Sequence, residues 1–176
     1  MTTTSNYKLS QWAATDPVRR SDFNSDNAKI DAAIAGKTEF IKLKELTLTG
    51  KVTSAYTLSL SGINMAAWQY VLLDIHLVGD GTFNMFPTGS KSATCNVMTN
   101  SSSQSGFTRL NTAGFYRIIF LTMGDPSAPM QVLTLGPQLI YGKDDTKFSQ
   151  VTGMEFQPYS GAYFDPGTKF TVWGIK

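Results

Sequence analysis

Residues 52–60 read VTSAYTLSL, and this stretch sets the prediction for most of the chain. Its large apolar side chains, Val52, Tyr56, Leu58 and Leu60, fall on one face, while small and polar side chains fall on the other. Alternation with a period of two is typical of an antiparallel strand that buries one face and exposes the other. The stretch therefore predicts a half-buried strand.

The same period extends to both sides. Before it, Ile41 and Leu43 alternate with lysines, and the apolar phase shifts after Glu45, which predicts a β-bulge or a break between two strands. After it, residues 68–78 (WQYVLLDIHLV) are apolar on both faces, as expected for a central strand. Gly79-Asp80-Gly81 then predicts a turn.

Further strands are predicted at short, regular intervals: Thr82 to Phe86, Ser92 to Met98, Phe107 to Leu110, Phe115 to Thr122, Gln131 to Leu135, Gln138 to Tyr141, Gln150 to Gln157 and Lys169 to Ile175. Two polar stretches, residues 100–106 and 142–146, are predicted to be loops. Many short strands without helical periods between them indicate a mainly β protein, an antiparallel β-sandwich of the jelly-roll kind. We assign this head domain to residues 38–176.

Residues 1–37 have a different pattern, that of an extended arm followed by a short α-helix. Ser21 is the expected N-cap, the helix runs from Asp22 to Ile34, and Gly36 stands where a left-handed C-cap is expected. One stripe of this helix has the four-three-four spacing of a coiled-coil seam with one polar member: Phe23, Asn27, Ile30 and Ile34.

A helix this short is marginal alone in water, so its apolar stripe must be covered. We favour copies of the same helix, in a bundle that joins subunits. The alternative is that the stripe packs against the β domain of its own chain.

The composition argues against several classes of function. The net charge is only +2 and the basic residues are dispersed, which does not predict binding to nucleic acid. No apolar run is long enough to span a bilayer, and the start lacks the pattern of a secretory signal. We expect a protein made in the cytoplasm that acts outside only after lysis or as part of a particle. The single cysteine, Cys95, is expected to be a core residue.

Catalytic and metal-binding patterns are weak. Asp74 and His76 share a strand face, which makes a pair possible, but a polar strip on an exposed sheet face or at a subunit contact is the simpler interpretation. Asp144 and Asp145 match no calcium loop. We therefore predict a binding or structural protein, with no catalytic residue, metal or cofactor.

Aromatic residues give the best candidates for binding. The segment from Tyr159 to Gly167 is rich in turn residues and carries three aromatic side chains, and loops at the ends of a sandwich commonly bind ligands. The predicted binding residues are Tyr159, Tyr163 and Phe164. The alternative is a hairpin whose aromatic rings only cap the core.

The first thirty residues carry a recognisable pattern: Trp12, Asp16-Pro17 and the stretch DFNxDNxxID at residues 22–31. They resemble the N-terminus of tail-fibre and receptor-binding proteins from phages and prophages of Gram-positive bacteria. The final strand, residues 167–175, is similar to the closing strand of many phage receptor-binding domains.

The resemblance implies a homotrimer in a virion, attached to other tail or baseplate proteins through an arm that includes Trp12. Its heads would bind a cell-wall polysaccharide or teichoic acid, with avidity from several weak sites. Two alternatives stay open: a structural baseplate or fibre-adaptor subunit that binds no receptor, and, least favoured, a glycan-degrading enzyme.

Overall fold

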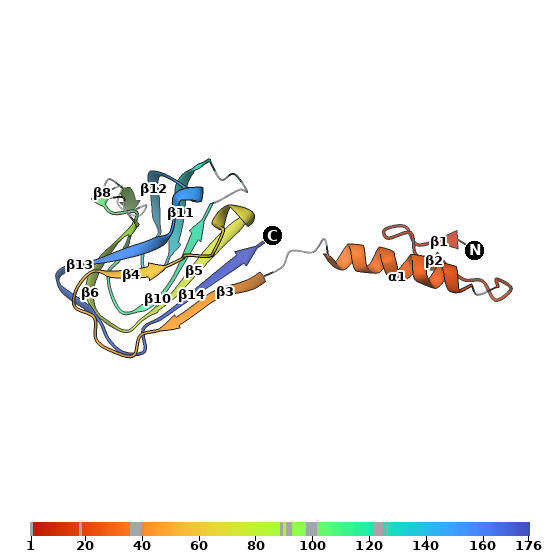
Figure 1. Ribbon diagram of the computed structural model, residues 1–176, viewed down its shortest axis with the longest axis horizontal. Coiled ribbons are helices and arrows are strands. Elements are labelled where there is room, and N and C mark those ends of the chain that lie inside the picture. Colours follow the sequence, from red (N-terminus) through yellow and green to blue (C-terminus); the bar gives the residue numbers. More distant parts are fainter. Residues whose placement is uncertain are drawn as a thin grey trace. The chain divides into compact units, whose positions relative to one another are not determined.

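The computed structural model describes residues 2–17, 19–35, 40–88, 90, 93–97, 102–121, 125 and 127–176. The chain divides into two compact units, Met1–Thr38 and Glu39–Lys176, and each is described by itself (Figure 1). Strands make up 53% and helices 13% of the described residues, so the predicted mainly β class is confirmed. No helix in the described part of the chain is both long and apolar enough to cross a membrane.

The N-terminal unit consists of a small hairpin and a helix. β1 (Thr2–Thr3) pairs antiparallel with β2 (Ser10–Gln11), and α1 (Arg20–Ala35) follows. The predicted helix is confirmed, but Ser21 is not its N-cap, because the backbone N–H of Asp22 already donates to the carbonyl of Arg19. The predicted C-cap, Gly36, lies outside the described residues.

The larger of the two sheets in the C-terminal unit has eight described strands in the order β3-β14-β5-β10-β11-β12-β7-β8. These strands are β3 (Phe40–Thr47), β5 (Tyr70–Leu77), β7 (Thr94–Val97), β8 (Ser102–Ser105), β10 (Gly114–Phe120), β11 (Pro129–Leu135), β12 (Ile140–Lys147) and β14 (Lys169–Ile175). As predicted, the doubly apolar strand β5 is central, with β14 on one side and β10 on the other.

The smaller sheet has four described strands in the order β4-β13-β6-β9: β4 (Tyr56–Ser59), β6 (Gly79–Pro87), β9 (Thr108–Leu110) and β13 (Gly153–Phe164). Two short 3₁₀ helices, η1 (Met65–Ala67) and η2 (Phe148–Gln150), connect strands. Both sheets are antiparallel wherever their described strands pair.

The two sheets share one hydrophobic core. Phe164 of β13 in the small sheet lies 6.0 Å, centroid to centroid, from Phe170 of β14 in the large sheet. Leu58 of β4, from the stretch that predicted the fold, is fully buried in the same core. The core is rich in buried phenylalanines: Phe83, Phe107, Phe120, Phe148, Phe156, Phe164 and Phe170. Burial of such rings supplies much of the hydrophobic stabilisation of a β domain.

The predicted turn at Gly79-Asp80-Gly81 is wrong. The chain crosses from the large sheet to the small sheet at Val78, and β6 begins immediately at Gly79. The glycines allow close contact with β13 instead of a turn: a Cβ at Gly81 would lie 2.5 Å from the Cβ of Ala162. Glycine is required where backbones approach this closely.

Three stretches predicted as loops are wholly or partly strands. Residues 102–105, within the predicted loop 100–106, form β8, and residues 142–146 belong to β12. β13 continues through the predicted turn-rich segment as far as Phe164, with a register shift between Tyr159 and Tyr163. These strands consist largely of polar residues and pair through their backbones, so they lack the alternation of apolar side chains that predicts a strand.

The bulge predicted near Glu45 is confirmed. In the pairing of β3 with β14, Val172 lies opposite Lys44 and Trp173 lies opposite Lys42, so Leu43 is the extra residue. The shift keeps Leu46 and Leu48 directed toward the core.

Candidate functional site

The outer face of the large sheet carries a groove of about 660 Å³ in the described part of the C-terminal unit. Strand alternation places its side chains, because Leu73, Ile75 and Leu77 of β5 point into the core. Their neighbours Asp74 and His76 therefore point outward. The complete lining comes from β5, β10, the end of β11 and β14: Asp74, His76, Phe115, Tyr116, Arg117, Leu135, Gly136, Lys169 and Thr171.

Strand register arranges the groove in two cross-strand rows. His76 is paired in register with Phe115 on one side and with Lys169 on the other. Two residues along, Asp74 is paired in the same way with Arg117 and Thr171. Directly opposed side chains on one sheet face are close enough to interact, so each row acts as one unit.

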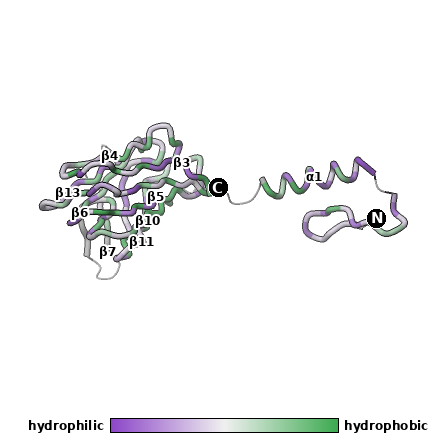
Figure 2. The backbone as a smooth tube through the Cα atoms, turned by 90° about the horizontal axis from the view of Figure 1, so that it is seen from below, coloured by the Kyte–Doolittle hydropathy of each residue, from purple (hydrophilic) through white to green (hydrophobic). Residues whose placement is uncertain are grey.

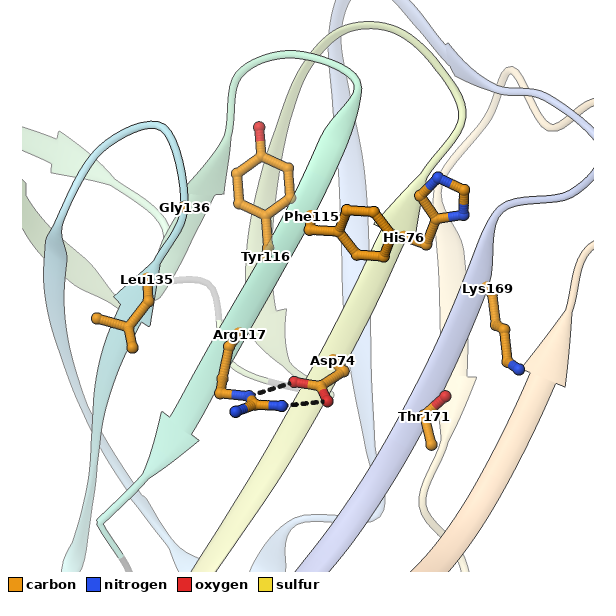
Figure 3. A pocket seen from close by; sticks show the side chains of 9 residues that line it. All are labelled: Asp74, His76, Phe115, Tyr116, Arg117, Leu135, Gly136, Lys169 and Thr171. Atoms are coloured by element: carbon orange, nitrogen blue, oxygen red, sulfur yellow. Dashed lines mark hydrogen bonds and ion pairs between the residues drawn. The ribbon is translucent and has the colours of Figure 1, made fainter.

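The first row presents an exposed aromatic surface. The rings of His76 and Phe115 are stacked with centroids 4.4 Å apart and an interplanar angle of 12°. Phe115 is 73% exposed, which is unusual for so large an apolar side chain on a regular strand. Figure 3 shows the two rings next to each other above the polar pair of the second row.

The second row is a bidentate ion pair. Arg117 donates from Nε to Asp74 Oδ1 at 2.7 Å and from Nη2 to Asp74 Oδ2 at 2.8 Å (Figure 3). The indole Nε1–H of Trp173 donates to the same Oδ2 at 3.1 Å. The hydrogen bond and charge of Asp74 raise the pKa of the Arg117 guanidinium. Three donors thus fix the orientation of this carboxylate.

Next to the groove, Glu45 of β3 holds two lysines. Lys169 Nζ lies 3.1 Å and Lys42 Nζ 3.3 Å from Glu45 Oε2. Hydrogen bonds from Lys169 and then Lys42 lower the pKa of the Glu45 carboxyl. The cation of the first row, Lys169, is therefore paired.

Behind the groove, the core-facing side chain of Tyr116 is hydrogen-bonded to the segment that precedes β10. Tyr116 accepts hydrogen bonds at its hydroxyl from the backbone N–H groups of Asn111 and Thr112 and donates to the carbonyl of Thr112 at 2.7 Å. A Cβ at Gly136 would lie 2.6 Å from the Tyr116 ring, so the glycine allows this wall to close tightly.

The possible pair of Asp74 with His76 does not form, because Asp74 binds Arg117 and Trp173 while His76 stacks on Phe115. The preferred interpretation, a polar strip on an exposed sheet face, agrees with the structure. Sequence reasoning missed Phe115 and Arg117. The period-two pattern of β10 could have identified them as outward-facing, since both alternate with the buried residues Tyr116 and Ile118.

The three aromatic residues predicted to bind a ligand have different surroundings. Phe164 is fully buried and stacks on Phe83 at 3.9 Å, so the prediction is wrong for this residue, which belongs to the core. Tyr159 is 60% exposed, with the Arg109 guanidinium 5.6 Å from its ring centroid. Tyr163 lies under the ammonium group of Lys51, at 3.4 Å. The two tyrosines flank the β13 bulge, where Ser160 and Gly161 have positive φ angles.

The predicted seam of α1 is exposed in the chain. Phe23, Ile30 and Ile34 are 52%, 40% and 62% exposed, and Asn27 is exposed beside them. Figure 2 shows that α1 contains both hydrophobic and hydrophilic residues. A shallow hollow of about 200 Å³ lies between Tyr7 of the arm and the C-terminal end of this stripe.

The arm is fastened to the side of α1 that flanks the stripe. The backbone N–H of Ser10 donates to Asp26 Oδ2 at 2.8 Å, and Lys29 Nζ donates to the carbonyl of Lys8 at 2.7 Å. The bond from Ser10 is the main cause of the lowered pKa of the Asp26 carboxyl. Trp12 stacks on Phe23 with ring centroids 5.9 Å apart.

The other candidate residues, Cys95 and Asp144, are buried residues of the fold. Cys95 is buried, and burial raises the pKa of its thiol, as expected of a core cysteine. Asp144 accepts hydrogen bonds from the Ser90 hydroxyl and the Thr146 backbone N–H. Among the described residues, no three metal-ligating side chains of the His, Cys, Asp or Glu type come together.

Comparison with known proteins adds no relative: no family model, curated protein or solved structure matches this chain.

Proposed function

We propose that this chain is a fibre-type attachment protein of a phage or phage-tail-like particle. It forms a homotrimer through α1, docks on other tail or baseplate proteins through the arm and Trp12, and binds a host cell-wall polysaccharide or teichoic acid with its head. The two sheets of the head form a sandwich of the jelly-roll kind.

The exposed stripe of α1 is the observation that carries this proposal. Ile34 is 62% and Phe23 52% exposed, although the neighbouring side of the same helix already holds the arm through Asp26 and Lys29. A single short helix gains little by exposing apolar side chains to water, and isolated helices of this length are marginal. Copies of the stripe cover one another in a trimer, and Asn27 within it fixes the register.

The hollow beside Tyr7 supports the same assembly. It is lined by Tyr7, Ile30, Ala33 and Ile34 and is open to solvent in the single chain. An apolar side chain from a neighbouring helix fits such a hollow as a knob fits a hole. The arm therefore contributes to the subunit contact as well as to attachment.

The head supplies the receptor contact. Its groove combines an exposed ring, Phe115, with a fixed ion pair, and such surfaces bind ligands that have both apolar faces and hydroxyl groups. Single sites of this open kind bind weakly. Three sites held by one stalk increase the apparent affinity by about 10²–10⁴-fold when all engage one surface.

The test is binding of the fluorescently labelled intact protein to a panel of Gram-positive cell walls. We expect the wild type to bind at least one wall, and Ile30→Asp, which places a charge in the stripe, to bind it at least about 100-fold more weakly. Ala32→Asp is the matched control, because it adds the same charge at an exposed position on the opposite face of α1. It is expected to bind like the wild type.

Binding to no wall, together with copurification with tail components, would replace the proposal by a structural baseplate or adaptor role. Equal binding by the wild type and Ile30→Asp would show that attachment does not depend on the helix.

A further inference from the structure

We infer that the groove on the large sheet binds a neutral saccharide, with a pyranose ring stacked on Phe115 and its hydroxyl groups bound by the Asp74–Arg117 pair. This inference rests on the proposed function and assigns both the site and the chemical class of the ligand. The ligand is a sugar ring without phosphate or carboxylate at the point of contact.

The stacking surface is already in place. Phe115 is 73% exposed, and its ring stacks parallel to His76 with centroids 4.4 Å apart. The C–H face of a pyranose is apolar and flat, and a fixed aromatic ring offers it a matching area at low entropic cost. The volume of about 660 Å³ lies within the range of small-molecule sites.

The polar partner is preorganised as well. Asp74 receives donors from Arg117 and Trp173, so its carboxylate cannot turn away from the groove without breaking them. A carboxylate side by side with a guanidinium presents an acceptor and a donor in one plane. Two adjacent hydroxyl groups of a sugar, each both donor and acceptor, match this pattern.

Charge favours a neutral ligand over an anionic one. Each cation of the groove already has a carboxylate: Arg117 pairs with Asp74 at 2.7 Å and Lys169 with Glu45 at 3.1 Å. A phosphate bound to either cation would lie beside the carboxylate already paired with it and would be repelled by that carboxylate at close range. A neutral hydroxyl group adds to the same pairs without breaking them.

The same residues argue against a protein subunit as the occupant. Arg117 and Asp74 keep 49% and 28% of their side-chain surface exposed in the middle of the face. Covering a half-exposed ion pair with protein costs desolvation, and the centres of protein interfaces are depleted in charged residues. The hydroxyl groups of a small ligand can instead form hydrogen bonds with Asp74 and Arg117 and replace the water that they displace.

The experiment uses the intact protein with ligand-observed saturation-transfer NMR and a panel of probes: methyl glycosides of glucose, galactose and N-acetylglucosamine, against methyl phosphate and glycerol 1-phosphate. The indole Nε1–H signal of Trp173, assigned with Trp173→Phe, reports where a probe binds. We expect at least one glycoside to bind and shift this signal, and the phosphates not to bind.

Four variants locate the site. Phe115→Ala should weaken glycoside binding about tenfold, because it removes the stacking ring, and Phe115→Tyr should retain it. Tyr159→Ala tests the competing site, the exposed tyrosine of the small sheet that the sequence predicted, and should leave glycoside binding in the groove unchanged. Asp74→Asn removes the carboxylate charge from Arg117 and should shift the preference toward methyl phosphate.

Several results would overturn the inference: loss of binding in Tyr159→Ala but not in Phe115→Ala, preference of the wild type for the phosphates, or a change of oligomeric mass in Phe115→Ala, which would mark the face as a subunit contact. Binding to cell walls without binding to any glycoside would reject this inference while the proposed function stands. Binding to neither would reject both.

Discussion

Phe115 and Phe164 are the same residue type with opposite surroundings. Both lie on regular strands, yet Phe115 is 73% exposed on the outer face of β10 and Phe164 is fully buried between the sheets. Their position in the strand alternation decides this, because odd-numbered residues of β10 point outward whereas Phe164 of β13 points inward. The bulge between Tyr159 and Tyr163 holds two extra residues and therefore keeps the phase of β13: Phe156 before it and Phe164 after it are both buried.

The difference leads to a stability prediction. Phe164→Ala removes a ring that stacks on Phe83 in the core and should lower the free energy of unfolding by about 3–5 kcal/mol. Phe115→Ala removes an exposed ring and should change it by less than about 0.5 kcal/mol. Urea unfolding followed by circular dichroism measures both. Equal losses would show that Phe115 is covered in solution.

Strands in which apolar and polar side chains clearly alternate were predicted closely, whereas strands made of polar residues were not. The prediction for Lys169 to Ile175 matches β14 completely, because buried Phe170 and Val172 alternate with outward residues. β8, at one end of the large sheet, consists of Ser102-Ser103-Gln104-Ser105 and has no apolar member. Its pairing with β7 depends on backbone hydrogen bonds, which leave no trace in side-chain hydropathy.

The groove could be predicted only in part from the sequence. The strip of Asp74 and His76 was visible in β5, but its partners on β10 and β14 follow from strand order, which sequence periodicity does not determine. Without the order β14-β5-β10, Arg117 and Trp173 cannot be placed at Asp74. The long sequence separations explain why the site was missed: Arg117 is 43 residues and Trp173 99 residues from Asp74.

The N-terminal unit provides a pH test. Because the folded pKa of Asp26 is lowered, the bond from Ser10 stabilises the arm at every pH above the ordinary carboxyl pKa of 3.8. That stability is lost as the pH falls from 3.8 through the lowered folded value. We expect the fluorescence of Trp12, which stacks on Phe23, to change over this acidic range as the arm leaves α1.

Asp26→Asn is the control for this titration, since an amide does not titrate there. The difference between the two proteins isolates the contribution of Asp26 from other acid-sensitive groups. An arm signal that is flat down to pH 2 in the wild type, or identical in both proteins, would contradict the role of this carboxylate.

The whole molecule carries two kinds of surface, the exposed apolar stripe of α1 and the groove on the outer face of the large sheet. We propose that the stripe joins copies of this chain, so that a weak groove acts through several copies at once. The proposed function depends on this association through α1.

Sedimentation equilibrium at micromolar concentration measures this association. We predict that the wild type and Ala32→Asp have three times the chain mass of 19.3 kDa, whereas Ile30→Asp has the mass of a single chain with its β-sheet circular dichroism unchanged. A wild type that sediments at 19.3 kDa, or an Ile30→Asp protein that keeps the mass of the trimer, would contradict it.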